Sequence, residues 1–250
     1  MSIYERRQKI MDLLMNRSPK SVAVNDIIRM MGDSPATIRR DLLSLEQDGY
    51  IERVRGYAKY VMPEPVRRIL FSEEKNAIGK SAASLVPDGY TIMMDSGSIT
   101  LAMANHLMDK KDLTVVTNSL SIANAFLDAE IATNMTGGYL LGKEEALVGQ
   151  DAEDYVKRVK APLLFLSTTG IRGSQGLSCV TPFQAKMKHT FIGSAEKVVL
   201  LIEEKTFKKY ALTVFADFSE IDTIITSCPI QDLALQARLN ELGVEVIIAG

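Results

Sequence analysis

Seven short apolar runs constrain the fold of this 250-residue chain more than any other sequence feature. Each run is five or six residues long, and the stretches between the runs have the apolar spacing of amphipathic helices. The runs are Tyr90–Met94, Leu113–Thr117, Ile131–Met135, Pro162–Leu166, Val198–Ile202, Ile221–Thr226 and Val244–Ile248. Continuous apolar runs are typical of parallel strands, because helices cover both faces of such a sheet. The pattern predicts an α/β domain with a mainly parallel sheet over residues 71–250.

The first sixty residues follow a different pattern, that of short helices and a hairpin. Apolar spacing and turn residues predict helices over Ile3–Asn16, over Asn25–Gly32 with Asn25 as N-cap, and over Pro35–Gln47. Two β-prone stretches, Tyr50–Val54 and Ala58–Val61, lie on either side of a turn at Arg55-Gly56-Tyr57. Three helices and a basic hairpin predict a winged helix-turn-helix over residues 1–61.

A proline-rich segment separates the two patterns. Pro63 and Pro65 flank Glu64, and because proline restricts its own backbone and that of the residue before it, we expect a semi-rigid linker over residues 62–70. Up to Arg68 the chain holds thirteen Lys or Arg and nine Asp or Glu, a net charge of +4, whereas the whole chain has a net charge of −2. A basic head on an acidic body favours a nucleic-acid-binding module, with chance placement of charges as the alternative.

The third expected helix carries the side chains that we expect to read DNA. In helix-turn-helix proteins the N-terminal part of this helix reaches base edges, while neighbouring residues and the wing contact phosphates. Arg40 has the fork geometry to bond guanine O6 and N7. The predicted DNA-contacting residues are Ser34, Ala36, Thr37, Arg39, Arg40, Arg53, Arg55 and Lys59. For Arg39-Arg40-Asp41 the alternative is an ordinary solvated helix face.

Loops of small polar residues follow four of the predicted strands. They contain Asp95-Ser96-Gly97-Ser98, Thr117-Asn118-Ser119, Thr136-Gly137-Gly138 and Ser167-Thr168-Thr169-Gly170. Parallel sheets bind ligands at this edge, and free N–H groups there suit a phosphate or carboxylate. Plain helix caps are the alternative role of such residues. Lys186, on the helix expected after Thr181-Pro182, is a candidate countercharge for an anion, with a solvated lysine as the alternative.

The head resembles the DeoR family of bacterial transcriptional regulators over about residues 3 to 60. Thr37-Ile38-Arg39-Arg40-Asp41-Leu42 matches the recognition-helix motif of that family completely. The wing turn reads Arg55-Gly56-Tyr57-Ala58 where the family has His-Gly-Gly-Ala, so the histidine and the second glycine are missing. The resemblance implies a sequence-specific DNA-binding regulator of sugar-metabolism genes, with repression as the expected outcome and a double-stranded operator as its partner.

The second domain resembles the DeoR-family effector domain, which shares its fold with ribose-phosphate isomerases, glucosamine-phosphate deaminases and CoA transferases. The loops at Asp95, Asn118, Gly137-Gly138 and Thr169-Gly170 carry the match, together with Ile221–Thr226. Because that family domain typically senses phosphorylated sugars, the resemblance implies such an effector. The implied pocket residues are Asp95, Gly97, Ser98, Thr100, Asn118, Ser119, Gly138, Gly170, Lys186 and Glu203.

One segment departs from the family pattern. The family reads Leu-Ala-Asp-Ser-Ser-Lys-Phe where this chain has Leu201-Ile202-Glu203-Glu204-Lys205-Thr206-Phe207, so glutamate replaces aspartate and the lysine is displaced. If Glu203 and Glu204 both faced the pocket, the additional carboxylate would repel a phosphate. The segment predicts an atypical sugar phosphate or weak binding, with a degenerate sensor used only for oligomerisation as the alternative.

Other function classes have less support. A sugar-phosphate isomerase could use Asp95, Glu203 and Lys186 for proton transfer, but it would leave the DNA-reading head unexplained, so we expect no enzyme. Cys179 and Cys228 lack the spacing of a disulfide framework or a zinc site, and we expect no metal and no cofactor. The chain begins without the apolar core of a signal peptide, and no apolar run reaches the ~20 residues of a membrane helix, which predicts a cytoplasmic protein without membrane contact. One small head makes few DNA contacts, so we expect a homo-oligomer, a dimer or higher.

Overall fold

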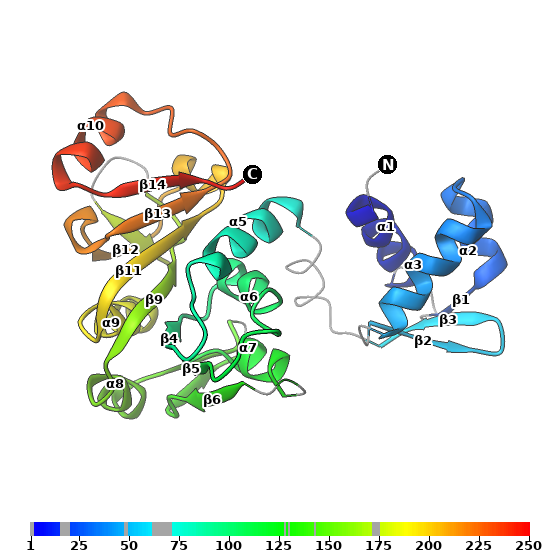
Figure 1. Cartoon of the computed structure of the whole chain (residues 1–250), viewed down its shortest axis with the longest axis horizontal. Helices are drawn as coiled ribbons and strands as arrows, with labels where there is room; N and C mark the ends of the chain where they lie inside the picture. Colours follow the sequence, from blue (N-terminus) through cyan, green and yellow to red (C-terminus); the bar gives the residue numbers. More distant parts are fainter. Residues whose placement is uncertain are drawn as a thin grey trace. The chain divides into compact units, whose positions relative to one another are not determined.

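The computed structural model describes residues 3–15, 21–47, 50–61, 72–127, 129, 131–142, 144–171 and 176–250. The chain divides into two compact units, Met1–Glu73 and Glu74–Gly250 (Figure 1). The predicted linker, residues 62–70, lies outside the described residues. Among the helices of the described residues, none is long and apolar enough to cross a membrane.

The first unit has the predicted winged helix-turn-helix architecture. Its strands form an antiparallel sheet in the order β1-β3-β2. The left-handed backbone of Gly32 (φ 72°) ends the second helix as expected. The elements are α1 (Ile3–Met15), β1 (Ser21–Ala23), α2 (Val24–Met31), α3 (Pro35–Gln47), β2 (Ile51–Val54) and β3 (Tyr57–Tyr60).

Strand β1 is the main difference from the prediction for this unit. Three residues are too short to show the alternation of a strand, yet β1 pairs with β3, with Val22 opposite Ala58. This pairing keeps the backbone extended through Ala23, which is the N-cap of α2 and makes no side-chain capping bond. The prediction of Asn25 as N-cap is therefore wrong, because the helix starts directly after the strand at Val24.

An apolar core holds the described part of the first unit together. Ile10 and Leu14 of α1 and Ile38, Leu42 and Leu45 of α3 are all 0% exposed in this core. Their spacing of three or four residues places them on one face of each helix, as predicted. Burying each such side chain stabilises the fold by roughly 1.5–3 kcal/mol.

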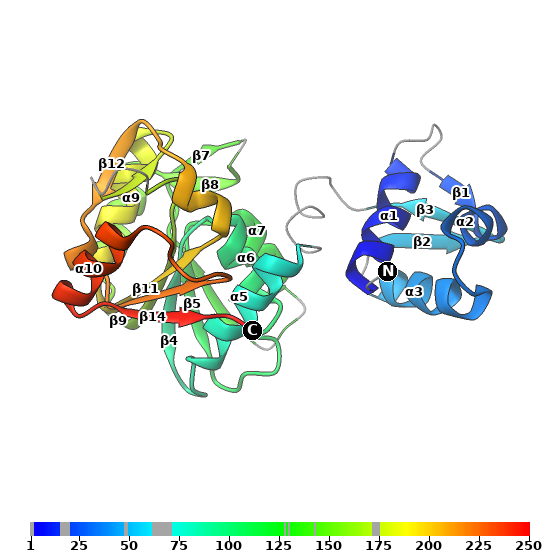
Figure 2. The same cartoon turned by 90° about the horizontal axis from the view of Figure 1, so that it is seen from above.

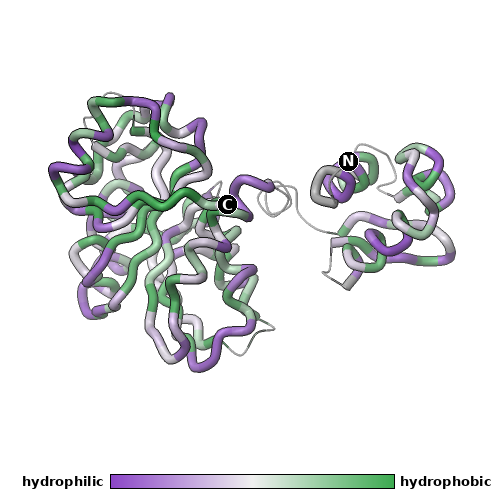
Figure 3. Tube along the Cα trace, turned by 45° about the horizontal axis from the view of Figure 1, so that its top comes forward, coloured by the Kyte–Doolittle hydropathy of each residue, from purple (hydrophilic) through white to green (hydrophobic). Residues whose placement is uncertain are grey.

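The second unit contains a seven-stranded sheet, and its strands are the seven predicted apolar runs. The strand order is β14-β13-β11-β9-β4-β5-β6, and every neighbouring pair is parallel. Figure 3 shows that the strands crossing this unit are mostly hydrophobic. The predicted parallel α/β architecture is therefore confirmed. The strands are β4 (Thr91–Met94), β5 (Thr114–Thr117), β6 (Ala132–Met135), β9 (Ala161–Ser167), β11 (Ala195–Ile202), β13 (Thr223–Thr226) and β14 (Glu245–Ile248).

Helices cover both faces of this sheet (Figures 1 and 2). On one side lie α5 (Glu73–Ser84), α6 (Ser98–Ala104) and α7 (Leu120–Ala125), and on the other lie α8 (Gln150–Lys157) and α9 (Pro182–Ile192). Two antiparallel ribbons were not predicted, and three of their four strands have only three residues. The remaining elements are the ribbon strands β7 (Tyr139–Leu141), β8 (Ala146–Val148), β10 (Leu177–Cys179) and β12 (Thr213–Ala216), the 3₁₀ helices η1 (Glu204–Lys208) and η2 (Phe218–Glu220), and α10 (Leu233–Leu242).

The order in which the strands are added reverses between β4 and β9. From β4 the chain adds β5 and β6 on one side, whereas β9, β11, β13 and β14 extend the sheet on the other side. At such a switch point the loops after the two central strands diverge and leave a crevice at their carboxyl ends, where ligands bind in open α/β sheets. The polar loops that begin at Asp95 and Thr168 both start at this point.

Candidate functional site

A buried carboxylate, Asp95, lies at the carboxyl end of β4 beside this crevice and is 1% exposed. Ser167, at the end of β9, donates to Asp95 Oδ2 from its backbone N (2.9 Å) and from its hydroxyl (2.7 Å). Lys188 of α9 forms an ion pair with the same oxygen and donates to the carbonyl O of Ser167 (2.9 Å). Thr100 Oγ1 and the N of Gly97 donate to Asp95 Oδ1 at 3.0 and 3.1 Å. Asp95 therefore links β4, β9, α6 and α9.

The surroundings of Asp95 favour its ionised form. Burial by itself raises the pKa of this carboxyl, but the charge of Lys188 and the hydrogen bonds from Lys188 and Ser167 outweigh burial, so the pKa lies below its ordinary value. Lys188 is 8% exposed, and its Nζ lies 5.6 Å from the centre of the Phe215 ring. The additional hydrogen bonds from Ser167 and Thr100 hold this buried ion pair in a fixed position at the base of the crevice.

A cavity of about 280 Å³ opens next to this network, and we call it the switch-point cavity. The loops after β4, β9 and β11 line it, together with α5, α9 and η1. Four lysines and a single carboxylate among the lining residues give it an excess of positive charge, and hydroxyl and amide side chains add hydrogen-bonding groups. Such a lining suits a small anion that carries hydroxyl groups. The lining residues are Lys75, Ser96, Gly97, Ser98, Ile99, Ser167, Thr168, Thr169, Gln184, Lys188, Leu201, Glu203, Lys205, Thr206 and Lys209.

Glu203 is the carboxylate in this lining, and two lysines compensate its charge. Its Oε1 accepts a hydrogen bond from Lys205 Nζ at 2.7 Å, and its Oε2 lies 3.9 Å from Lys75 Nζ. Glu204 is exposed, lies 4.0 Å from Lys208 and is not part of the lining. The repulsion of a phosphate was expected only if Glu203 and Glu204 both faced the pocket. Glu203 alone lines the cavity, and the two lysines compensate its charge.

Lys75 is the other buried cation of the cavity, 9% exposed. Burial lowers the pKa of this ammonium, whereas the negative charge of Glu203 opposes that shift.

The structure brings five of the ten predicted effector residues to this region. Gly97, Ser98 and Glu203 line the switch-point cavity, and Asp95 and Asn118 line a smaller space next to it. Thr100 is fully buried behind the lining, and its hydroxyl supports Asp95.

The other four predicted residues lie elsewhere. Ser119 caps α7, its Oγ accepting from the N of Ile122 at 3.2 Å. Gly138 and Gly170 allow close approach of two chain segments, because a Cβ there would lie 2.6 Å from the carbonyl O of Val148 and 2.5 Å from that of Lys209. Lys186 is 63% exposed at its side chain, and its Nζ lies 2.8 Å from Glu153 Oε2, so it lines neither cavity. Lys188, two residues further along α9, holds the position expected for Lys186.

Helical spacing could have identified two of the missed lysines. Lys188 lies three residues from the buried Ala185 and Phe191, and Lys75 lies three and four residues before the buried Ile78 and Gly79. A lysine on the apolar face of a helix needs a buried partner, and this requirement identifies Lys188 and Lys75 as candidate site residues. Lys205 and Lys209 lie in and just after a short 3₁₀ helix without apolar periodicity, and only the tertiary fold brings them to the cavity.

The first unit carries a second candidate site, a basic surface on α3. Arg39 and Arg40 are exposed, as is Ala36, and within the described residues neither arginine has a hydrogen-bonding or ion-pair partner. Ser34 caps the helix, its Oγ accepting from the N of Thr37 at 3.2 Å. Leu43, which was not predicted, is 43% exposed three residues after Arg40.

The wing adds Arg55 and Lys59, which are both exposed. Arg55 (φ 50°) and Gly56 (φ 85°) have the two positive φ angles of a type I′ hairpin turn, which does not need a second glycine. Arg53 is engaged within the protein, because its Nε lies 2.6 Å from Glu46 Oε2 and its backbone N donates to Glu46 Oε1 at 3.0 Å. This hydrogen bonding lowers the pKa of Glu46 and connects the wing to α3.

Asp41 fixes the orientation of α3 and thereby of its basic surface. It is 1% exposed and accepts a hydrogen bond from Arg6 Nε of α1 at 2.5 Å, with Arg7 Nε at 3.4 Å from its other oxygen. The arginines of the Arg39-Arg40-Asp41 group therefore face outward, and the aspartate faces α1.

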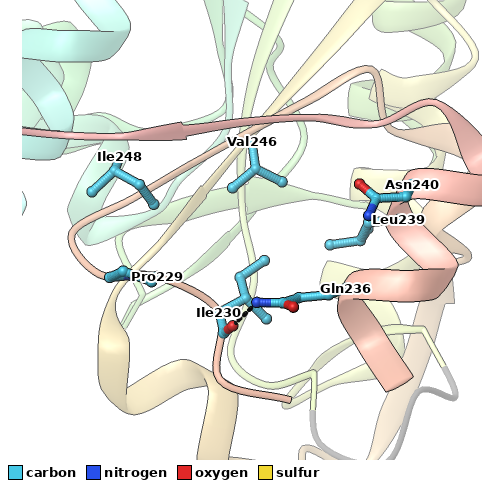
Figure 4. Close-up of a pocket in the computed structure, with 7 residues that line it drawn as sticks. All are labelled: Pro229, Ile230, Gln236, Leu239, Asn240, Val246 and Ile248. Carbon is cyan, nitrogen blue, oxygen red and sulfur yellow. Dashed lines mark hydrogen bonds between the residues drawn. The ribbon is translucent and has the colours of Figure 1, made fainter. Parts of the chain in front are cut away.

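A second cavity, of about 250 Å³, lies between α10, β14 and the segment before α10 (Figure 4). The amide of Gln236 donates to the carbonyl O of Ile230 across one end of it. None of the residues that line it is charged, so it does not suit an anion. The lining residues are Pro229, Ile230, Gln236, Leu239, Asn240, Val246 and Ile248.

Two family models match this chain. One, described as a DeoR-like helix-turn-helix domain, matches residues 6–64, and one described as the DeoR C terminal sensor domain matches residues 71–228.

Several curated relatives match this chain over nearly their whole length. The HTH-type transcriptional regulator GlpR of Haloferax volcanii is 30% identical over 97% of this chain and 96% of its own length. The HTH-type transcriptional regulator GolR of Listeria innocua is 30% identical over 98% of each chain. The glycerol-3-phosphate regulon repressor of Escherichia coli K12 is 26% identical over 90% of this chain and 91% of its own length.

Solved structures give a more distant match. Ribose 5-phosphate isomerase A of Methanocaldococcus jannaschii is 14% identical with a TM-score of 0.37, covering 55% of this chain and 53% of the isomerase. The chain thus spans about half the length of that enzyme.

Proposed function

The chain belongs to the DeoR family of DNA-binding transcriptional regulators, and we propose that it represses sugar-metabolism genes under the control of a phosphorylated sugar bound in the switch-point cavity. The lining of that cavity is the observation that carries the proposal. Lys188 is paired with Asp95, and Glu203 offsets part of the charge of Lys75 and Lys205, which leaves an excess of about two positive charges. A phosphate monoester carries about −1.5 to −2 at pH 7 and would neutralise this excess.

The sugar part of the ligand has matching groups in the same lining. Ser98, Thr168, Thr169 and Gln184 supply hydroxyl and amide groups that can donate to and accept from sugar hydroxyls. Repression and a phosphorylated small molecule are also what the name of the glycerol-3-phosphate regulon repressor describes for that relative.

The DNA partner is a double-stranded operator, read by α3 with Arg40 on base edges and with Arg39, Arg55 and Lys59 on phosphates. The protein acts in the cytoplasm. Two or more chains bind DNA together, because one head of this size makes too few contacts for tight specific binding. Ligand and DNA are coupled when the effector binds one arrangement of the paired heads better than another. A coupling of about 1–3 kcal/mol changes DNA affinity about 5- to 150-fold.

A thermal-shift screen with matched variants tests the effector site. The full chain is melted with a panel of sugar phosphates and with their unphosphorylated parents, as wild type, Lys209→Ala and Lys208→Ala. Lys209 lines the cavity, whereas Lys208 is the adjacent exposed lysine outside it. A ligand at 100 times its Kd stabilises the native state by about 2.7 kcal/mol, which raises the melting temperature measurably.

We expect one phosphorylated sugar to raise the melting temperature of wild type and Lys208→Ala, with a smaller rise in Lys209→Ala and none from the parent sugar. The same compound should change the affinity for a DNA duplex selected by the protein from a random library, measured by fluorescence anisotropy. If no compound shifts the melting temperature while the duplex is bound tightly, the proposed effector site is wrong and the domain serves oligomerisation alone.

A further inference from the structure

The first turn of α5 forms one wall of the switch-point cavity. Glu74 accepts hydrogen bonds from the backbone N of Glu204 (2.6 Å) and from the hydroxyl of Ser227 (2.7 Å). These bonds place the start of α5 over the ends of β11 and β13. Lys75, the next residue, reaches into the cavity lining. The helix that begins the sensor unit thus shares its first turn with the ligand site.

Glu203 interacts electrostatically with two of the four lysines that line the cavity. Its carboxylate is 12% exposed at the side chain and lies between Lys205 Nζ, 2.7 Å from Oε1, and Lys75 Nζ, 3.9 Å from Oε2. An anion bound in the cavity is attracted to the same two ammonium groups and is repelled by the carboxylate of Glu203. The two anions therefore compete for the same cations.

We propose that Glu203 is an internal counter-anion that an anionic effector displaces from Lys75 and Lys205, and that Lys75 transmits this exchange to the first turn of α5. The inference rests on the proposed function, since it concerns the regulation of the same cavity. Lys75 is the cation through which the cavity reaches α5, whereas Lys205 lies on η1. A ligand alters α5 only if it interacts differently with two states of that helix, and the partner exchange at Lys75 supplies the difference.

The first consequence concerns affinity and is tested with inorganic phosphate. Calorimetric titrations at constant ionic strength compare the full chain as wild type, Glu203→Gln and Glu204→Gln. Glutamine keeps the shape of the side chain and removes the competing charge. Glu204 is the matched control because it is exposed and outside the lining.

We expect Glu203→Gln to lower the Kd for phosphate about tenfold, equivalent to about 1.4 kcal/mol, and Glu204→Gln to change it less than about twofold. A Kd that is unchanged or raised in Glu203→Gln overturns the inference, because Glu203 then does not compete with the anion. Absence of phosphate binding in all three proteins also overturns it.

The second consequence concerns transmission and is tested with Lys75→Met and Lys205→Met. Each variant removes one cation from Glu203, and both should weaken phosphate binding. Hydrogen–deuterium exchange of the α5 amides is then measured with and without saturating phosphate, after melting curves have established that both variants are folded.

We expect phosphate to change exchange of the amides of residues 77–79, which donate back to the first turn of α5, in wild type and in Lys205→Met, and to leave it unchanged in Lys75→Met. An equal change in both variants, or no change in wild type, overturns the role of Lys75. Failure of the proposed function is a separate result, since it would appear as a DNA affinity that no sugar phosphate alters even though phosphate binds and moves α5.

Discussion

At Asp95, donors from three segments of the chain converge on two carboxylate oxygens: Gly97 and Thr100 on one, Ser167 and Lys188 on the other. Each donor alone contributes little net stability, because water would satisfy it in the unfolded chain. Removing the carboxylate charge has a larger effect, since it leaves the buried ammonium of Lys188 without its counter-ion.

Asp95→Asn should therefore destabilise the full chain by about 3 kcal/mol at pH 7, measured by urea denaturation. The pKa of Asp95 is lowered in the folded state, so its stabilisation is fully present above the unfolded pKa of about 3.9 and is lost as the pH falls through the folded value. The difference between wild type and variant should then shrink below about pH 4. A difference that stays constant from pH 7 to pH 3 would show that folding does not lower the pKa of Asp95.

Arg39 and Arg40 are adjacent, exposed and chemically identical, yet they should differ in effect. Arg40→Ala should cost about 1–3 kcal/mol of discrimination between the selected duplex and variants of it, because a bidentate base contact is lost. Arg39→Ala should weaken binding to all duplexes alike and reduce the slope of affinity against salt by about one phosphate contact. Fluorescence anisotropy at several salt concentrations separates the two, and equal behaviour of both variants would remove Arg40 from the base-reading face.

At the scale of elements, the loop between β4 and α6 touches the end of β9 at Gly97. A Cβ on Gly97 would lie 2.3 Å from Ser167 Oγ, so a side chain there must displace the serine that bonds Asp95. Gly142, in the turn after β7, has nothing within 4 Å of such a Cβ. The two glycines thus offer a matched comparison.

Gly97→Ala should destabilise the chain by about 2 kcal/mol and weaken phosphate binding, whereas Gly142→Ala should change stability by less than about 0.5 kcal/mol. Urea denaturation and phosphate titration measure the two effects. Normal phosphate binding in a folded Gly97→Ala protein would show that Ser167 does not shape the cavity.

The orientation of α3 depends on Asp41, and an exposed ion pair elsewhere in the same unit serves as its control. Asp41→Asn should lower the stability of the first unit by about 2 kcal/mol, because it removes the negative charge opposite Arg6 and one of the two oxygens that accept from Arg6 and Arg7. Asp26→Asn, which loses the exposed pair with Arg29 at 3.0 Å, should cost less than about 0.5 kcal/mol. Hydrogen exchange of the α1 and α3 amides in the full chain measures both, and similar protection in the two variants would argue against the proposed role of Asp41.

Sequence patterns predicted the strands of the parallel sheet and missed several of the shortest strands. All seven strands of the parallel sheet were predicted from their apolar runs. The five central strands are largely buried and therefore apolar, whereas the edge strands β6 and β14 are partly exposed. Strand β1 and the ribbons β7–β8 and β10–β12 were not, because most of these strands have only three residues, too few to show a period. In addition, β1 and β10 pair with strands that are distant in sequence. Composition predicts the polar loops after β4 and β9, whereas distinguishing Lys188 from Lys186 requires the apolar phase of α9, which places Lys188 on the buried face and Lys186 on the exposed one.

At the scale of the whole molecule, the chain contains two basic sites in separate units, each with its own core. We expect two or more chains to bind one duplex, which sedimentation of protein–DNA mixtures will measure as the number of chains per duplex. A tight complex with a single chain would contradict the proposed pairing of heads and would require control to act within one chain.

The hydrogen-bond network around Asp95, at the end of β4, can form only late during synthesis of the chain. Asp95 is separated by 72 residues from Ser167 and by 93 from Lys188, so its network cannot close until α9 has left the ribosome. At about 5–20 residues per second, several seconds pass between translation of Asp95 and that of Lys188. The described core of the first unit is formed by residues between Ile10 and Tyr60, so the contacts of this core can form during that interval. The DNA-binding unit is therefore able to fold before the network that supports the sensor cavity can form.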